Sequence, residues 1–227
     1  MGCRVLFVRV CRGHQEHAAL GTWAMRAVRQ AEKDPRISYV NEMVADECPT
    51  DVCRNKIALI ARRLKIDYLF STDHDNVPHA NWFSSSLDYL IANPLSVVAA
   101  PYVGCRPQHE GAKDRPIHVM IPDDKVGYRH VTRAEAMAGL TGFQPVSGVA
   151  TLLAIDMKIF EKLSLPWWAY EYHDEHHSEA GSEDYWFSKR CTDAGINLVV
   201  NWDCPAIHHK SEGLALWDKR DEELAKR

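Results

Sequence analysis

Short apolar runs rich in β-branched residues alternate along this chain with longer segments whose apolar residues recur at helical spacing. The short runs predict strands and the longer segments predict helices. We predict strands at residues 4–10, 37–44, 67–71, 95–101, 147–155 and 196–201. We predict helices over residues 16–33, from Thr50 to about residue 64, between Trp82 and Asn93, over 133–140 and 156–163, and from the N-cap Ser182 to about Ala194. Such alternation is typical of a mostly parallel sheet with helices on both faces, in which ligands bind beyond the carboxyl ends of the strands.

Length, charge and cysteine content exclude several classes of protein. The 227 residues suffice for one α/β domain with a sizeable core. The 27 basic and 31 acidic residues give a net charge of −4, which argues against a nucleic-acid backbone as the dominant partner. The seven cysteines include no C-x-x-C pair, which favours reduced thiols over a zinc ribbon or a disulfide framework. No apolar run approaches the roughly 20 residues of a spanning helix, and no signal-peptide pattern is present, so we expect a soluble, cytoplasmic protein without a membrane partner.

The strongest chemical signal is Asp73-His74-Asp75, which directly follows the predicted strand at 67–71. Two carboxylates on a turn at the carboxyl end of a strand can reach the same side of the sheet edge. Hard divalent cations such as Mn²⁺ or Mg²⁺ prefer oxygen ligands and can bridge to a diphosphate. The alternative is a solvated turn whose aspartates cap the start of the following helix.

The residues around this turn resemble the nucleotide-sugar half of GT-A glycosyltransferases. In that superfamily a helix with an Arg-Asn pair precedes a strand that ends in D-x-D and a V-P or I-P turn. The corresponding residues are Arg54-Asn55-Lys56, the strand residues Tyr68-Leu69-Phe70, and Asp73-His74-Asp75-Asn76-Val77-Pro78.

The second half of the chain is similar to the acceptor side of the same superfamily. Three segments carry this similarity: Ser147-Gly148-Val149-Ala150 for the "GG" or "SG" strand, Ser182-Glu183-Asp184-Tyr185-Trp186-Phe187 for the start of the "GEDxdf" helix, and His208-His209 for the histidine that completes metal coordination in many members. Ser182 stands where Gly is usual. The resemblance spans residues 4–210 and implies one GT-A type, Rossmann-like domain with a nucleotide-sugar half (1–101), an acceptor-side half (102–210) and a charged tail (211–227).

The resemblance also implies roles for individual residues. Asp75 would hold an Mn²⁺ or Mg²⁺ ion, Asp73 would hold it directly or through water, and His208 would be the third protein ligand, with His209 as the less favoured choice. The cation would neutralise the diphosphate leaving group. The residues expected to contact the donor nucleotide or its phosphates are Arg9, Arg12, Arg54, Asn55, Asp73 and His74.

Glu183 and Asp184 lie where inverting members of the superfamily carry their catalytic carboxylate. We expect Asp184 to take the proton from an acceptor hydroxyl and Glu183 to bind the sugar or the acceptor. Alternatively, both carboxylates could only cap the start of the helix and have no catalytic role. The resemblance thus implies metal-dependent, inverting transfer of a sugar from a nucleoside diphosphate sugar, with UDP as the expected nucleotide, to a hydroxyl of a carbohydrate, a protein or a modified nucleic-acid base.

Three other stretches have a functional and a structural interpretation. Residues 167–170 (Trp-Trp-Ala-Tyr) could stack against a sugar or belong to the core. Residues 173–177 (His-Asp-Glu-His-His) lie in a predicted loop at 166–181, and could bind a metal, form a lid over the site or be a solvated segment. The basic residues between 106 and 115 lie in an irregular stretch at 102–145, and could meet an anionic acceptor or solvent.

Three other functions stay open at this point. A nucleotidyltransferase would carry a Gly-rich basic loop after the first strand, where this chain has only Arg12-Gly13-His14. A non-catalytic protein on the same scaffold would bind the nucleotide sugar and lack the base. A zinc protein would use the histidines of residues 173–177 and would retain zinc without nucleotide.

Overall fold

The computed structural model describes residues 2–11, 17–46, 49–103, 116–124, 127–172 and 179–209. Four of the predicted features lie outside the described residues: the donor contact of Arg12, the basic stretch at 106–115, the histidine-rich stretch at 173–177 and the charged tail at 211–227.

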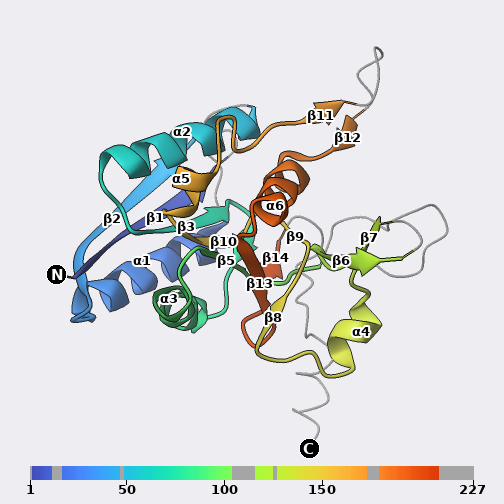
Figure 1. Ribbon diagram of the computed structural model, residues 1–227. Helices are drawn as coiled ribbons and strands as arrows, with labels where there is room; N and C mark the ends of the chain where they lie inside the picture. Colours follow the sequence, from blue (N-terminus) through green and yellow to red (C-terminus); the bar gives the residue numbers. More distant parts are fainter. Residues whose placement is uncertain are drawn as a thin grey trace, which may run out of the picture.

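A seven-stranded sheet with the strand order β2-β1-β3-β10-β5-β13-β8 forms the centre of the molecule (Figure 1). Its strands are β1 (Cys3–Val10), β2 (Ile37–Ala45), β3 (Tyr68–Asp73), β5 (Ser96–Ala99), β8 (Phe143–Pro145), β10 (Leu153–Asp156) and β13 (Asn197–Asn201). β1 is parallel to β2 and β3, and β5 is parallel to β13. β10 runs antiparallel between β3 and β5, and β8 runs antiparallel to β13 at the edge. The sheet is therefore mixed but mostly parallel, as the sequence predicts.

Helices cover both faces of this sheet (Figure 1). One face carries α1 (Ala18–Lys33) and α3 (Trp82–Ala92), and the other carries α2 (Thr50–Arg63), α5 (Ile159–Lys162) and α6 (Glu183–Asp193). The short helix α4 (Arg133–Met137) lies away from the sheet. The predicted helices are thus confirmed, with ends shifted by a few residues.

The central strands are buried on both sides, which explains their continuous apolar runs. In β1, Val5 and Phe7 pack into the core under α1 and α3, whereas Leu6 and Val8 pack into the core under α2. Successive side chains of a strand point to opposite faces, so a strand between two helical layers needs apolar residues at every position.

Three small sheets complete the described structure. They are β7-β6-β9, built from β6 (Val119–Asp123), β7 (Gly127–His130) and β9 (Gly148–Val149); β4 (Asn76–Val77) with β14 (Ile207–His208); and β11 (Glu171–Tyr172) with β12 (Glu179–Gly181). The first two border the site described below.

Three sequence predictions need correction here. The single strand predicted at 147–155 is divided, because β9 pairs with β6 whereas β10 pairs inside the central sheet. The predicted loop at 166–181 contains the β11–β12 pair, and the irregular stretch at 102–145 contains the β6–β7 hairpin. In each case the pairing joins segments that are not adjacent in the sequence, so local sequence carries little sign of it.

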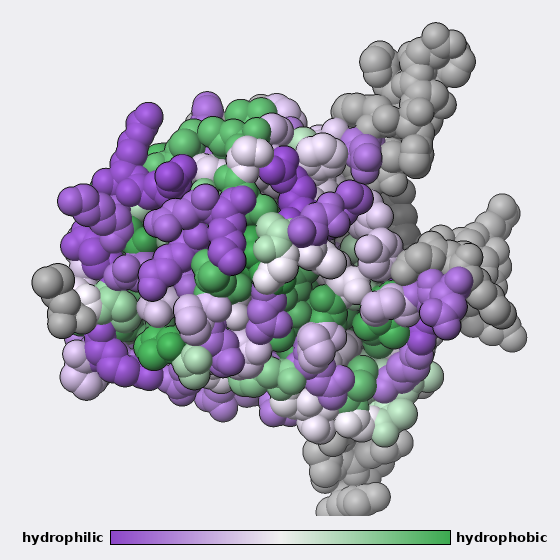
Figure 2. All heavy atoms as spheres, in the orientation of Figure 1, coloured by the Kyte–Doolittle hydropathy of each residue, from purple (hydrophilic) through white to green (hydrophobic). Residues whose placement is uncertain are grey.

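The face seen in Figure 2 is covered mainly by hydrophilic side chains, with hydrophobic ones visible in smaller groups between them. Among the described residues, no helix combines the length and the apolar character needed to cross a membrane.

Candidate active site

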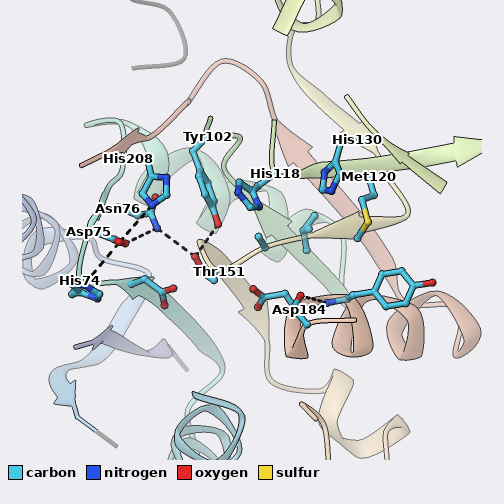
Figure 3. A pocket seen from close by; sticks show the side chains of 16 residues that line it. His74, Asp75, Asn76, Tyr102, His118, Met120, His130, Thr151, Asp184 and His208 are labelled. Atoms are coloured by element: carbon cyan, nitrogen blue, oxygen red, sulfur yellow. Dashed lines mark hydrogen bonds and ion pairs between the residues drawn. The ribbon is translucent and has the colours of Figure 1, made fainter. Parts of the chain in front are cut away.

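A cavity of about 480 Å³ lies at the carboxyl end of β3, where Asp73 is the last strand residue. Both halves of the chain line it, and two of its walls carry chemically active groups (Figure 3). The first wall consists of His74, Asp75, Asn76 and His208. The second wall consists of His118, Met120, His130, Asp184 and Tyr185.

In the first wall, His208 and Asp75 face each other. β14 brings His208 beside Asn76 of β4, and the His208 Nε2 atom lies 3.5 Å from Asp75 Oδ2. The other ring nitrogen, Nδ1, is 3.0 Å from the carbonyl oxygen of Val103, which can only accept a hydrogen bond. In neutral His208 the proton therefore sits on Nδ1, and Nε2 presents its lone pair to the carboxylate.

This pair of facing lone pairs fits a divalent cation. The 3.5 Å between the two atoms is close to the about 3 Å that separates neighbouring ligands of an octahedral cation. Asn76 Nδ2 donates to Asp75 Oδ1 at 3.2 Å and so helps to orient the carboxylate. Among the described residues, no group of three His, Cys, Asp or Glu side chains is arranged to hold a metal by itself. Asp75 and His208 are therefore two candidate ligands of a cation.

Asp73 turns toward Arg54 instead. The Arg54 Nη2 atom lies 3.0 Å and 3.3 Å from the two carboxylate oxygens of Asp73. Burial raises the pKa of Asp73, and the adjacent guanidinium opposes that rise. His74 also lines the cavity, with its Nε2 atom 3.9 Å from Asp75 Oδ2.

Asp184 is the carboxylate of the second wall. It lies in the first turn of α6, next to the N-cap Ser182, whose hydroxyl accepts from the backbone N–H of Tyr185. Its Oδ1 atom is buried and has no hydrogen-bond partner in the described structure. Burial raises the pKa of Asp184 well above its ordinary value, and Arg54, whose Nη2 atom is 3.8 Å from Oδ1, opposes that rise. A buried carboxylate of this kind at a cavity is suited to accept a proton near neutral pH.

Glu183 lies beside Arg54, with its Oε1 atom 3.6 Å from the guanidinium Nε. The structure thus brings Asp73, Glu183 and Asp184 together around one arginine. It also brings Asp75 and His208 together, as the sequence predicts for a metal site.

Other predicted donor contacts have different surroundings. Asn55 uses its amide to hold residues Trp167 and Trp168: its Nδ2 donates to Trp168 O at 2.7 Å and to Asp51 O at 2.8 Å, and its Oδ1 accepts from Trp167 N at 2.9 Å. These bonds differ from the expected contact with a base or ribose, because they engage both donors of the amide. Arg9, on β1, forms an ion pair of 2.8 Å with Glu42.

Residues 167 and 168 belong to the core. Trp168 stacks on Phe187 with ring centroids 4.4 Å apart, and Trp167 packs against Phe160 at 4.7 Å. Both tryptophans are buried, so of the two interpretations of this stretch the structural one holds for them.

His209, the alternative ligand, takes another role in the described structure. Its ring stacks on that of His17 with centroids 3.6 Å apart, and its backbone N–H donates to Asp75 O at 2.8 Å. His209 therefore supports the turn of the first wall through its backbone.

The sequence reasoning missed several residues of the cavity. The Tyr102 hydroxyl is 3.2 Å from Thr151 Oγ1, and the Tyr102 ring stacks on His118 at 4.8 Å. Tyr102 follows β5 by three residues, so the rule that ligands bind beyond strand ends could have found it. His118, Met120 and His130 reach the cavity only through the β6–β7 hairpin, whose register pairs Met120 with His130.

Comparison with known proteins supports the fold. No family model matches the sequence, and no curated protein matches it either. Among solved structures, the chain is similar to A197 from STIV, with 17% identity and a TM-score of 0.58 over 93% of this chain and 88% of the other. It is also similar to GalNAc-T7, crystallised with UDP, GalNAc and Mn²⁺, with 14% identity and a TM-score of 0.55 over 93% of this chain and 45% of the other. The protein therefore has a mixed α/β scaffold like that of GT-A glycosyltransferases.

Proposed function

We propose that this protein is a metal-dependent glycosyltransferase that moves a sugar from a nucleoside diphosphate sugar to an acceptor hydroxyl. The observation that carries the proposal is the cavity itself, with the Asp75–His208 pair in one wall and Asp184 in the other. The GalNAc-T7 structure holds UDP, GalNAc and Mn²⁺ on a similar fold, which supports UDP as the nucleotide and Mn²⁺ or Mg²⁺ as the cation.

The first wall is the proposed donor side. Asp75 and His208 would hold the cation, with Asp73 contributing directly or through water. When bound, the cation would neutralise the negative charge of the leaving diphosphate. His74 lines the same wall and could hydrogen-bond the donor. Contacts of Arg9, Arg12 and Asn55 with the donor remain predictions.

Asp184 is the proposed general base. The acceptor oxygen attacks the anomeric carbon while the bond from that carbon to the diphosphate oxygen breaks, and the electron pair leaves with the nucleoside diphosphate. The acceptor hydroxyl proton passes to the carboxylate of Asp184, which lines the cavity. Attack from the face opposite the leaving group inverts the anomeric centre. Glu183 would support this acid–base centre from beside Arg54.

The second wall is the proposed acceptor side. His118, His130 and Tyr185 present flat rings to the cavity, and Met120 adds an adaptable apolar surface. Rings of this kind suit the C–H face of a carbohydrate as well as a protein side chain or a modified base. We also propose a cytoplasmic setting, because the thiols of Cys3, Cys191 and Cys204 are free.

Isothermal titration of UDP, GDP and their sugars, with and without Mn²⁺, tests the proposal on wild type and Asp75→Ala. We expect one nucleotide to bind only with the metal, and Asp75→Ala to abolish that binding. Absence of nucleotide binding under every condition would overturn the proposal. A non-catalytic protein on this scaffold would bind the nucleotide sugar without hydrolysing or transferring the sugar.

A further inference from the structure

Arg54 is almost completely buried, with 2% of its surface exposed, although its guanidinium is permanently charged. It projects from α2 into a group of three carboxylates that other elements supply. Its Nη2 atom is 3.0 Å from Asp73 Oδ1 and 3.8 Å from Asp184 Oδ1, and its Nε atom is 3.6 Å from Glu183 Oε1. We refer to Arg54 and these three carboxylates as the arginine cluster.

The arginine cluster joins the two halves of the chain. Asp73 ends β3, whereas Glu183 and Asp184 begin α6, more than 100 positions later in the sequence. Glu183 and Asp184 are buried and Asp73 is partly buried, so the three carboxylates would repel one another, and one shared cation offsets part of that repulsion. Removing Arg54 would leave the three negative charges without this compensation.

The Asp184 carboxylate lies within ion-pair distance of this arginine. Its Oδ1 atom lacks a hydrogen-bond partner in the described structure, and the Arg54 guanidinium lies 3.8 Å away. Figure 3 shows Asp184 at the edge of the cavity, on the opposite side from Asp75 and His208. The charge of Arg54 therefore influences the cavity indirectly, through the carboxylates of Asp73 and Asp184, which lie within ion-pair distance of its guanidinium.

The neighbouring residue strengthens this attachment. Asn55 hydrogen-bonds the backbone of Trp167 and Trp168, which pack against Phe160 and against Phe187 of α6. Consecutive residues of α2 therefore contact two different segments of the second half, so the turn of α2 that carries Arg54 is attached to that half at two places.

We propose that Arg54 is a positioning residue. It would keep the carboxylates of Asp73, on the donor side, and Asp184, on the acceptor side, in the positions that transfer requires, without itself contacting the donor. This inference rests on the proposed function. A donor contact would act mainly on binding of the nucleotide sugar. A positioning residue of this kind acts mainly on the transfer step, because the Asp75–His208 pair remains to bind the cation.

The first test compares Arg54→Lys with wild type and with Arg36→Lys. Lysine keeps the charge but cannot present several N–H groups in a fixed plane, so it cannot serve three carboxylates at once. We expect kcat of Arg54→Lys to fall about 100-fold, while the Kd of UDP in the presence of Mn²⁺ changes by less than about 3-fold. Arg36 bridges Asp34 and Asp88 on the surface, at 2.7 Å and 2.6 Å, so Arg36→Lys is the matched control and should keep wild-type kcat and Kd.

A second test asks whether the guanidinium charge itself is required. Arg54→Ala leaves a space that free guanidinium can enter, whereas urea has the same shape and no charge. We expect millimolar guanidinium to restore at least about 10-fold of the lost kcat and urea to restore none. If Arg54→Ala does not fold, Arg54→Met combined with Glu183→Gln removes both a buried cation and one of its counter-charges, and is tested in its place. The double variant should unfold at a higher temperature than Arg54→Met alone.

The outcomes separate this inference from the proposed function. Weaker but still saturable Mn²⁺-dependent binding of UDP in Arg54→Lys, with kcat at saturating donor unchanged, would show that Arg54 contacts the donor and would overturn the inference. Wild-type kcat and Kd in Arg54→Lys would overturn it as well. If wild type itself binds no nucleotide, the proposed function fails, and the catalytic part of the inference fails with it. The Tm values of Arg54→Met and of the double variant with Glu183→Gln then still test the interaction within the arginine cluster. If the two substitutions change Tm independently of each other, that interaction is rejected as well.

Discussion

The two walls of the cavity differ in how their polar groups are satisfied. In the first wall the two proposed cation ligands are oriented by neighbours: Asn76 donates to Asp75 at 3.2 Å, and the His208 Nδ1 atom is 3.0 Å from the Val103 carbonyl oxygen. The Oδ1 atom of Asn76 itself is buried without a hydrogen-bond partner in the described structure. In the second wall the Oδ1 atom of Asp184 is buried and has no hydrogen-bond partner in the described structure. The proposed cation ligands of the first wall are thus oriented before any ligand arrives, whereas the Asp184 carboxylate of the second wall has one oxygen that makes no hydrogen bond in the described structure.

This difference follows from what each wall is proposed to do. A cation site needs ligands held at fixed positions, because preorganisation lowers the free-energy cost of binding. A general base must exchange a proton during the reaction, so an oxygen already engaged in hydrogen bonds would serve less well. A buried polar atom without a partner costs stability, and a catalytic role is one explanation for its retention.

Asp75→Ala should have the largest effect, because it removes one member of the Asp75–His208 pair. We expect the Mn²⁺-dependent part of nucleotide binding to be lost in titration calorimetry, and transfer with it. Asp88→Ala on α3 is the control, since that carboxylate is 60% exposed and pairs with Arg36. Retained Mn²⁺-dependent binding in Asp75→Ala would mean that the first wall is not the cation site.

Asp184→Asn should come next. It keeps the shape of the side chain and removes its ability to accept the proton, so we expect transfer to fall by about 10³-fold with nucleotide binding unchanged. In wild type, kcat should rise with pH through a pKa above the ordinary aspartate value, because burial raises the pKa of Asp184. Steady-state assays against pH would measure both effects.

The control for this variant is Asp193→Asn, at the other end of α6, where the carboxylate is 62% exposed and pairs with Lys189. Transfer by Asp184→Asn at the wild-type rate would remove Asp184 as the base and leave helix capping as its role.

His208→Ala should weaken Mn²⁺ binding by about 10- to 100-fold, because it removes one ligand of a pair and leaves Asp75 in place. His209→Ala provides the comparison within the same wall. Its ring stacks on His17 and its backbone N–H contacts Asp75, and that backbone contact survives the substitution. Titrations of Mn²⁺ with both variants would rank the two histidines, and a larger loss in His209→Ala would reverse our assignment.

The first wall could be predicted from sequence because its main signal is local. Asp73-His74-Asp75 follows a buried strand, and in α/β folds this position lies at the carboxyl edge of the sheet, where ligands bind. His208 lies far away in sequence and was assigned only through resemblance to a family. β14 brings it to β4, where it pairs with Asn76.

The second wall could be predicted only in part, since tertiary pairing assembles it. Asp184 is assigned through the resemblance of residues 182–187 to a family motif at a helix start. His118 and His130 reach the cavity through a hairpin register that the irregular stretch at 102–145 does not reveal. The antiparallel insertion of β10 between β3 and β5 was missed for the same reason, because strand order depends on long-range contacts. Arg54 and Asn55 were predicted as donor contacts, and their burial between the two halves could not be read from α2 alone.

The smallest expected effect is a change in Tm. It comes from surface contacts outside the cavity that support the second wall. The hairpin that carries Met120 and His130 is tied to α4 by a surface network. Arg129 donates to both carboxylate oxygens of Glu135, at 2.6 Å and 2.9 Å, and Glu135 also accepts from the Thr132 backbone at 2.8 Å in a capping box. We expect Glu135→Gln to lower Tm by about 2–3 °C at neutral pH.

The pH dependence of this effect tests its origin. The hydrogen bonds from Arg129 lower the pKa of Glu135 to about 2, from an ordinary value of 4.5. A lowered folded-state pKa means that the stabilisation is fully present above pH 4.5 and is lost as the pH falls through 2. The Tm difference between wild type and Glu135→Gln should therefore shrink over that interval in thermal scans. A difference that stays constant down to pH 2 would mean that Glu135 acts through packing, and that the second wall does not depend on this charge for its support.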